Sequence, residues 1–398
     1  MLRALIPAVA LVLASAAGAQ APSQSRGYPW EGRLVGGVQL AAQGEHFFTW
    51  DPIRKHSPNR GWRRFGNERL LRTLARVLAA HRAAFPDGSR VGVGDLSRPR
   101  GGDFGSRFGG IGHASHQNGL DVDVYYPRRD RRERAPVRPS QINRRLSQDL
   151  VDRFVLAGAE KVFVGPNTGL QGPPAVVEVL PAYHDNHMHV RLPGDGWRPA
   201  LVGRSTRARP IRAFAAGRGR PDVLVFGTIH GNERAGIAVA SRLVQTQPPA
   251  GGTVWVVPDL NPDGLAARTR WNARGVDLNR NFPGSWRASR RAGAAPASET
   301  ETRAAIRLIR RLRPHVTIWF HQPQGLVRAA GRSVRIARRY ARLAGMRFRE
   351  RPRPPGSATE WQHRSLPGTR AFVVELPPGA LGLRDAGRFV DAAFALAD

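Results

Sequence analysis

Apolar residues return with a helical period in two stretches of the first half of the chain. In residues 68–85 they recur every three or four positions from Leu70 to Leu78, and Asn67 just before them can cap the first turn. Residues 141–156 show a second pattern of this kind. Short apolar runs predict strands at residues 162–164, 176–179 and 188–192. These elements, separated by long irregular stretches, predict an α+β fold for this half.

The second half has a different pattern. Four β-branched apolar runs, typical of strands buried in a sheet, lie at residues 223–229, 253–257, 316–320 and 371–374. Helical stretches at residues 235–244 and 301–312 alternate with them. This alternation predicts an α/β domain with a mixed sheet flanked by helices.

Between the two halves the periodicity disappears. Glycine, proline and arginine are frequent after Pro193, so residues 195–210 are expected to form a polar linker. The chain then divides into a first domain at residues 30–194 and a second domain at residues 211–398, with no internal repeat relating them.

The first thirty residues have a character of their own. Arg3 precedes an apolar run that ends at Ala17, and small residues follow it, so residues 1–19 are expected to be a signal peptide. Residues 20–29 are mainly polar and are expected to form a tether. No later run reaches the roughly 18 apolar residues that a membrane helix needs, so no stable membrane insertion is expected. This pattern predicts a secreted, periplasmic or cell-wall-associated protein.

Composition narrows the set of partners. The 398 residues include no cysteine, which excludes disulfides and thiol chemistry, and arginine supplies nearly all of the net charge of +32. Such a surface attracts polyanions. Zinc-finger spacings and RNA-binding aromatic motifs are absent, so nucleic acid is not an expected partner. We expect an anionic polymer of the wall or envelope, with a solvated surface that binds no specific partner as the alternative.

Histidines and aspartates gather in two motifs of the first domain. In GHASHQNGLDVDV, apolar residues alternate with Asp121 and Asp123, which predicts a strand with both carboxylates on one face. In HDNHMHVRL, the same alternation puts His187 and His189 on one face, so one strand can supply both a metal ligand and a general base. Five histidines close to acidic residues argue against a solvated surface; they are His113, His116, His184, His187 and His189.

These motifs, with GDLSRPRGGDFG upstream, resemble the penicillin-insensitive murein endopeptidases, members of the wider lysostaphin, D-Ala-D-Ala peptidase and hedgehog group of zinc peptidases. The resemblance implies zinc ligands at His116, Asp123 and His189. It makes His187 the catalytic base or a stabiliser of the transition state. His184 would join the catalytic residues, and His113 would line the substrate site. The implied substrate is the peptide cross-link of peptidoglycan, between D-alanine and diaminopimelate.

The second domain carries a separate histidine and carboxylate set. HGNE places His230 at a predicted strand end and Glu233 three residues later, in the turn that enters a helix. His321 and Glu375 each follow a further predicted strand. Open α/β sheets collect ligands at such strand ends, so these side chains are expected to converge. Three protein ligands that leave a fourth position free are typical of catalytic zinc.

This set is accompanied by NPDG at residues 261–264, RWNARGVDLNRNFP at residues 270–283 and FVVELPPG around Glu375. Together they closely resemble the zinc carboxypeptidases of the carboxypeptidase A type, in particular the bacterial murein-peptide amidase branch. The resemblance implies zinc ligands at His230, Glu233 and His321. Glu375 would activate the attacking water and pass its proton to the leaving amine.

The same resemblance implies roles for three polar residues and one aromatic residue. Arg270 would stabilise the oxyanion, with Arg274 as the alternative. The residues that would hold a substrate carboxylate are Asn279 and Arg280. The aromatic residue that caps the substrate in this family would have to be Trp361 or His363.

Both domains together predict an exported, bifunctional zinc-dependent peptidoglycan hydrolase with two zinc ions per chain, one in each domain. The first domain would cut D-alanyl-diaminopimelate cross-links, and the second would cut stem-peptide bonds such as γ-D-glutamyl-diaminopimelate. Two alternatives stay open. The second domain could be a general metallocarboxypeptidase acting on external peptides, or one half could be a degenerate wall-binding module. Because all ligand positions are filled in both halves, two active enzymes are favoured.

Overall fold

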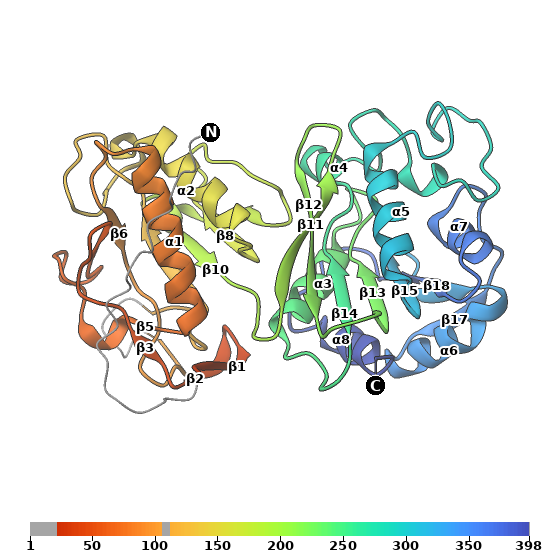
Figure 1. The fold of residues 1–398 in the computed structure, drawn as a ribbon, viewed down its shortest axis with the longest axis horizontal. Helices are drawn as coiled ribbons and strands as arrows, with labels where there is room; N and C mark the ends of the chain where they lie inside the picture. The colour runs from red at the N-terminus through yellow and green to blue at the C-terminus, as the bar shows by residue number, and fades with distance from the viewer. Residues whose placement is uncertain (1–21, 106–111, 398) are drawn as a thin grey trace, which may run out of the picture.

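The computed structural model describes residues 22–105 and 112–397, and these form two lobes that lie side by side (Figure 1). Each lobe is built around its own sheet. The expected signal peptide at residues 1–19 lies outside the described residues. No helix in the described part of the chain is both long enough and apolar enough to cross a membrane.

The first lobe has the predicted α+β composition. Its helices and strands are β1 (Gln24–Tyr28), β2 (Glu31–Val35), β3 (Val38–Gln39), β4 (Phe47–Thr49), β5 (Phe65–Gly66), α1 (Glu68–Ala84), β6 (Val91–Val93), β7 (Asp121–Tyr125), α2 (Arg144–Leu156), β8 (Lys161–Val164), β9 (Val177–Val179) and β10 (His187–Arg191). The main sheet has the order β4-β6-β7-β10-β8-β9. The two helices contact each other, and their apolar faces share one core with the central strands.

Two neighbouring strands of this sheet carry most of the predicted metal-binding residues. β10 pairs with β7 in the antiparallel register that sets His189 opposite Asp123, and β8 pairs with β10 so that Phe163 also lies opposite His189. Side chains two residues apart share a face of a strand. The pairing therefore brings the acidic residues of β7 and the histidines of β10 to one face of the sheet.

The helix predicted at residues 68–85 is confirmed as α1, and the side chain of Asn67 accepts a hydrogen bond from its first turn, as expected. The second helix, α2, begins at Arg144, three residues later than predicted. Residues 139–141 form a separate 3-10 turn, and the side chain of Asn143 then caps the α-helix.

The second lobe has the predicted α/β architecture, with a mixed sheet flanked by helices. Its elements are β11 (Arg198–Arg204), β12 (Pro210–Ala216), β13 (Val223–Phe226), α3 (Ala235–Gln245), β14 (Val254–Val257), α4 (Pro262–Ala267), α5 (Thr300–Leu312), β15 (Val316–His321), β16 (Leu326–Ala329), α6 (Val334–Leu343), β17 (Arg347–Glu350), α7 (Ala358–Ser365), β18 (Arg370–Glu375) and α8 (Gly387–Phe394). The strand order is β11-β12-β14-β13-β15-β18-β16-β17. The four central strands run parallel, and β12 and β16 run antiparallel to their central neighbours.

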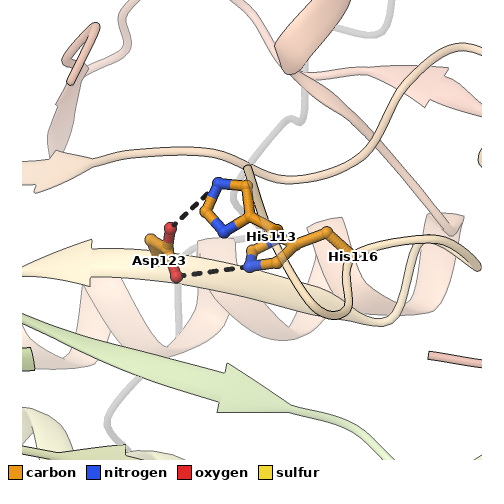
Figure 2. A group of neighbouring side chains, drawn as sticks. All are labelled: His113, His116 and Asp123. Carbon is orange, nitrogen blue, oxygen red and sulfur yellow. Dashed lines mark ion pairs between the residues drawn. The ribbon is translucent and has the colours of Figure 1, made fainter. Parts of the chain in front are cut away.

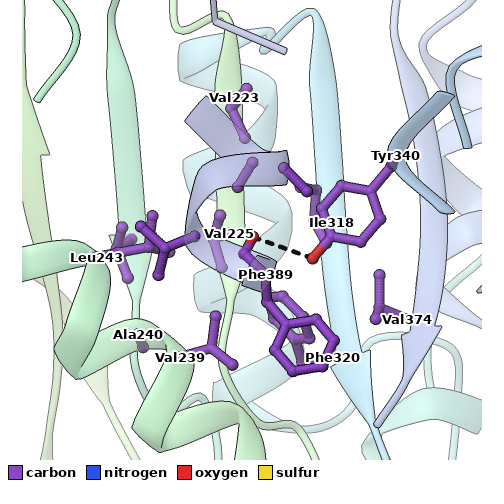
Figure 3. Close-up of a cluster of buried hydrophobic side chains, with 14 of the residues drawn as sticks. Val223, Val225, Val239, Ala240, Leu243, Ile318, Phe320, Tyr340, Val374 and Phe389 are labelled. Atoms are coloured by element: carbon purple, nitrogen blue, oxygen red, sulfur yellow. Dashed lines mark hydrogen bonds between the residues drawn. The ribbon is translucent and has the colours of Figure 1, made fainter. Parts of the chain in front are cut away.

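Alternating side chains of the central strands build a core on each face of this sheet. Val223 and Val225 belong to the core that α3, α6 and α8 cover, and Leu224 and Phe226 belong to the core under α5 and α7. Figure 3 shows the first of these cores, where the hydroxyl group of Tyr340 donates a hydrogen bond to a backbone carbonyl of α8. Packing on both faces explains why these strands are apolar throughout, and it holds their carboxyl ends in place.

The segment expected to be a linker at residues 195–210 contains a strand instead. β11 pairs antiparallel with β12 and is the end strand of the second sheet. Most of its side chains are exposed or half-buried, so the apolar pattern of a buried strand is missing. Pro199 and Gly203 are tolerated because an end strand needs hydrogen bonds on one side only, and the pairing is irregular just before Gly203.

The expected tether at residues 20–29 is also corrected, because residues 24–28 form β1, which pairs with β2 in a hairpin. The ring of Tyr28 stacks against the Arg242 guanidinium of α3 at 3.4 Å, and the Ser25 N–H donates to the Asp195 carboxylate at 2.6 Å. Backbone pairing needs no apolar side chains, so composition alone indicated a loose segment. The hairpin instead packs against the second lobe.

Two candidate metal centres

The first cluster lies on the face that β7 and β10 share. His116 reaches it from the loop before β7, with a positive φ of 67°. Its backbone N–H donates to Asp121 at 2.9 Å, which fixes this left-handed residue. Oδ1 of Asp123 lies 3.4 Å from Nε2 of His116, 3.5 Å from Nδ1 of His189 and 3.8 Å from Nε2 of His187. Three imidazole nitrogens therefore surround one carboxylate oxygen.

The resemblance placed His113 in the substrate site, but in the structure its Nε2 lies 4.0 Å from Oδ2 of Asp123. Figure 2 shows it beside His116, both facing Asp123. Among the described residues, His113, His116 and Asp123 form the compact ligand group, whose donor atoms all lie within 4.8 Å of one another. His189, the third ligand that the resemblance implies, faces Asp123 with its Nδ1, while its Nε2 lies 3.1 Å from Asp121.

The atoms at the centre of this cluster suit a metal ion. Nε2 of His116 and Oδ1 of Asp123 are buried, and neither makes a hydrogen bond within the described residues. The opposite ring nitrogen of His116 faces the Leu96 carbonyl, so the proton belongs on Nδ1 and the lone pair on Nε2. Burial raises the pKa of the Asp123 carboxyl, but His116 and His187 lower it well below its usual value. The cluster therefore offers an anionic oxygen and imidazole nitrogens, the donors that zinc prefers.

Two further histidines complete the surroundings of the first cluster. The rings of His184 and His187 lie 5.1 Å apart. Burial lowers the pKa of His187 to about 4, against the opposing effect of Asp123. A neutral imidazole at this position can accept a proton. The structure thus brings together the five histidines and Asp123 that the sequence singled out.

Asp121 and Asp95 support the cluster, although sequence analysis assigned them no role. Asp121 accepts hydrogen bonds from Nε of Arg191 at 2.7 Å and pairs with His189. Asp95 lies 2.8 Å from Nε2 of His113 and is paired with the buried Arg63. A carboxylate behind a histidine fixes the orientation of the ring. The sequence pattern that puts Asp121 and Asp123 on one face of the strand could have revealed the role of Asp121.

The second cluster forms where the central strands of the second sheet end. Nδ1 of His321 lies 2.9 Å from Oε2 of Glu233 and 3.1 Å from Nδ1 of His230, while the latter nitrogen lies 2.8 Å from Oε1 of Glu233. All three side chains are buried. The sequence prediction that these residues converge is consistent with this geometry, and the described residues offer them as a second ligand group.

Asp277 orients this cluster and was missed by the sequence analysis. Its carboxylate lies 3.0 Å from Nε2 of His230, which leaves Nδ1 to face the other two ligands. It also accepts a hydrogen bond from Nε of Arg270 at 3.1 Å, and Arg270 donates to Glu233 at 2.8 Å. The acidic residue in DLNRN was the available signal.

Glu375 lies beside this cluster because of strand pairing. β15 and β18 run parallel with His321 opposite Glu375. One carboxylate oxygen of Glu375 is 3.1 Å from Nη2 of Arg328, and the other is buried without a hydrogen bond among the described residues. Burial raises the pKa of Glu375, and Arg328 opposes this effect. Arg328 is one of the chain's many arginines, and no sequence signal set it apart.

The remaining predicted residues differ in accessibility. Arg270 is 37% exposed at the mouth of the cluster, whereas Arg274 is 57% exposed and lies 3.8 Å from the buried Glu299. Asn279 is buried against His321, and its side-chain oxygen accepts a hydrogen bond from the backbone of α7. Arg280 donates to the Asn279 carbonyl at 2.7 Å.

Trp361 cannot cap a substrate. Its side chain is fully buried in the core beneath α7, where its ring lies 5.7 Å from that of Phe282. Of the two aromatic candidates this leaves His363, which is only partly buried.

In the comparison with known proteins, each domain matches a different family profile. The family profile described as penicillin-insensitive murein endopeptidase matches residues 25–163, and the profile described as zinc carboxypeptidase matches residues 197–327. The first match includes His116 and Asp123, and the second includes His230, Glu233 and His321.

Named relatives match the second domain. Murein peptide amidase A of Vibrio campbellii is 30% identical over 210 residues, which cover 45% of this chain and 79% of the relative. The Escherichia coli protein of the same name is 34% identical over 139 residues, covering 30% of this chain and 57% of the relative, so the match spans little more than half of that protein.

Solved structures give similar matches. The murein-tripeptide amidase of Escherichia coli has a TM-score of 0.42 and 26% identity, with coverage of 50% of this chain and 90% of the other. Carboxypeptidase A of Helicoverpa armigera has a TM-score of 0.41 and 17% identity, with coverage of 51% and 65%. From the carboxypeptidase profile and the Vibrio relative, the chain belongs to the zinc carboxypeptidases, and it is a zinc peptidase of two domains whose residues 25–163 match the profile of the penicillin-insensitive murein endopeptidases.

Proposed function

We propose that the protein is an exported, bifunctional peptidoglycan hydrolase. The first domain opens D-alanyl-diaminopimelate cross-links, and the second cuts stem peptides at the γ-D-glutamyl-diaminopimelate bond. The observation that carries the proposal is the presence of two buried histidine and carboxylate clusters in separate sheets, each with a proton acceptor beside it. The family matches and the relatives named murein peptide amidase A support peptidoglycan as the common substrate.

Each cluster has the donors that one zinc ion requires. In the first, His116 and Asp123 would be joined by His189, or by His113, which lies in the compact group. In the second, the ligands would be His230, Glu233 and His321. Zinc bound at these residues would polarise the scissile carbonyl group and make water a stronger acid.

The protein supplies the proton transfers and the charge stabilisation. In the first domain the neutral His187 accepts the proton of the attacking water. In the second domain Glu375 does so and then protonates the leaving amine, while Arg328 keeps its carboxylate oriented. Arg270 stands at the cluster mouth, where it can stabilise a developing oxyanion, and Arg280 can bind a substrate carboxylate.

Digestion of purified cross-linked peptidoglycan tests this proposal. The intact protein is expected to convert cross-linked stems into uncross-linked stems and then to shorten them, and mass spectrometry identifies both products. His187→Ala should abolish only the opening of cross-links, and Glu375→Gln should abolish only the shortening of stems. Release of single C-terminal amino acids from unrelated peptides, without cleavage of stems, would instead show a general carboxypeptidase.

Export rests on the apolar run that ends at Ala17 and on the net charge of +32, which suits an anionic wall. Expression in a Gram-negative host followed by fractionation tests it. We expect a periplasmic or secreted product whose intact mass corresponds to cleavage after residue 19. A full-length cytoplasmic product would contradict the proposed location.

A further inference from the structure

A groove of about 370 Å³ lies between the two lobes and belongs to neither metal cluster. The first lobe lines it with residues of β8, β9 and β10, and the second lobe lines it with α3 and the loop that follows β18. Four of its residues recur at helical intervals along one face of α3 and its cap, namely Arg234, Ala238, Ser241 and Gln245.

One wall of the groove touches residues of the first cluster. Phe163 lines the groove, and its ring lies 5.3 Å from the ring of His189, edge to face. Arg191 also lines the groove, and its guanidinium holds Asp121, which in turn pairs with His189. The groove therefore begins at side chains that share a sheet face with the first centre.

The opposite wall is tied to the second cluster through Gln322. The side-chain oxygen of Gln322 accepts a hydrogen bond from Ala235 at 2.9 Å, and its backbone N–H donates to Glu233 at 3.2 Å. Its side-chain nitrogen donates to the carbonyl groups of Pro377 and Gly379, both at 2.8 Å, in the loop that continues along the groove. This wall thus starts at a ligand of the second centre.

The groove offers both charges and apolar surface. Its charged residues are Lys161, Arg191, Arg234, Glu160 and Glu178. Lys161 and Glu178 face each other at 3.4 Å, whereas Arg234 is exposed and forms no ion pair with another described residue. The apolar part is formed by Phe163, Ile237, Leu381 and Leu383. Such a lining suits a short peptide that carries both an amino group and carboxylates.

The product of the first domain has that chemistry. Hydrolysis of the D-alanyl-diaminopimelate amide adds one water and produces a carboxylate on D-alanine and an amino group on diaminopimelate. We propose that the groove binds this uncross-linked stem peptide and passes it to the second centre before it dissociates from the protein. This inference rests on the proposed function. Arg234 pairs with a carboxylate of the peptide, and Glu178 pairs with its amino group.

An internal competition tests the inference with the full chain. A cross-linked peptide dimer is digested together with an excess of isotope-labelled free stem peptide, and mass spectrometry follows trimming of both. If the two stem peptides mixed freely, each would be trimmed in proportion to its concentration. We expect the dimer-derived stem to be trimmed several-fold faster than this proportion predicts. Because both peptides are trimmed by the same second centre, the ratio does not depend on the overall rate of that centre.

Blocking the groove should remove this preference. Ala238→Trp fills the groove from α3, and Arg234→Glu reverses the exposed charge, so both should reduce the ratio toward that of simple mixing. The matched controls are Ala80→Trp and Arg76→Glu, at exposed positions of α1 outside the groove, and both should keep the preference. Simple mixing in the unaltered protein, or a preference that survives Arg234→Glu, would overturn the inference. Failure to release or to trim stems at all would instead refute the proposed function.

Discussion

The two metal clusters are built on opposite principles. In the first lobe the side chains project from the face of an antiparallel strand pair, so His189 and Asp123 meet because they are cross-strand partners. In the second lobe the side chains gather at the ends of parallel strands, where His321 and Glu375 are aligned. Sheet register therefore decides the first cluster, and strand order decides the second.

The two clusters nevertheless share one supporting device. Asp121 holds the far nitrogen of His189 and is paired with Arg191, and Asp277 holds the far nitrogen of His230 and is paired with Arg270. A carboxylate held by an arginine thus orients one histidine in each domain. The same arrangement occurs on two different folds. It is therefore explained by the need to fix the orientation of the histidine ring and not by the fold.

Removing a ligand should have the largest effect and shows whether the clusters are independent. His116→Ala should lose one zinc ion together with cross-link cleavage, and His230→Ala should lose the other ion together with stem trimming, because the ligand groups lie in different sheets. Elemental analysis of protein prepared with zinc should give two ions per chain for the unaltered protein and one for each variant. Loss of both ions from one variant would show that the clusters depend on each other.

Removing a proton acceptor should leave the metal in place. His187→Ala and Glu375→Gln should each lower the activity of their own domain by about 10²–10⁴-fold, the usual contribution of a general base. Zinc content serves as the control and should stay at two ions. If either change also slowed the other domain, the separation of the two centres would be disproved.

Replacing the aspartates that orient the histidines should reveal a smaller difference between the two clusters. Asp121→Asn and Asp277→Asn should each weaken zinc binding by about 10–100-fold, measured by competition with a chelator. Only the first should also lower the melting temperature clearly. It leaves Arg191 buried without its carboxylate, whereas the partly exposed Arg270 remains paired with Glu233. Equal melting temperatures for the two variants would contradict this difference.

Of these changes, added salt should alter the turnover of soluble peptides least, and by a similar small amount in both domains. Exposed charges are screened over about 8–10 Å at physiological ionic strength, whereas the buried clusters are not. Rising salt should release the protein from intact wall material in a sedimentation assay while turnover of soluble peptides changes little. A parallel fall of binding and turnover would assign the arginine-rich surface to the active centres.

Local patterns in the sequence placed some residues of both clusters, whereas the ligand roles came from the resemblance to the two peptidase families. Alternation along a strand put Asp121 with Asp123 and His187 with His189, and the strand ends pointed to His321 and Glu375. Apolar periodicity likewise located the core helices and the central strands. In these helices and strands the buried positions recur with the period of the element. Apolar residues therefore recur at the same spacing in the sequence.

Tertiary structure alone decided what has no such local signal. The end strand β11 and the hairpin strand β1 are held by backbone pairing, which does not require apolar residues. Arg328 became a partner of Glu375 only because β16 lies beside β18. Likewise Trp361 was placed in the core, and the groove arose only when α3 came to face β8. The Arg328–Glu375 pair and the groove join residues far apart in the chain, so their geometry depends on how the whole sheet and the two lobes pack.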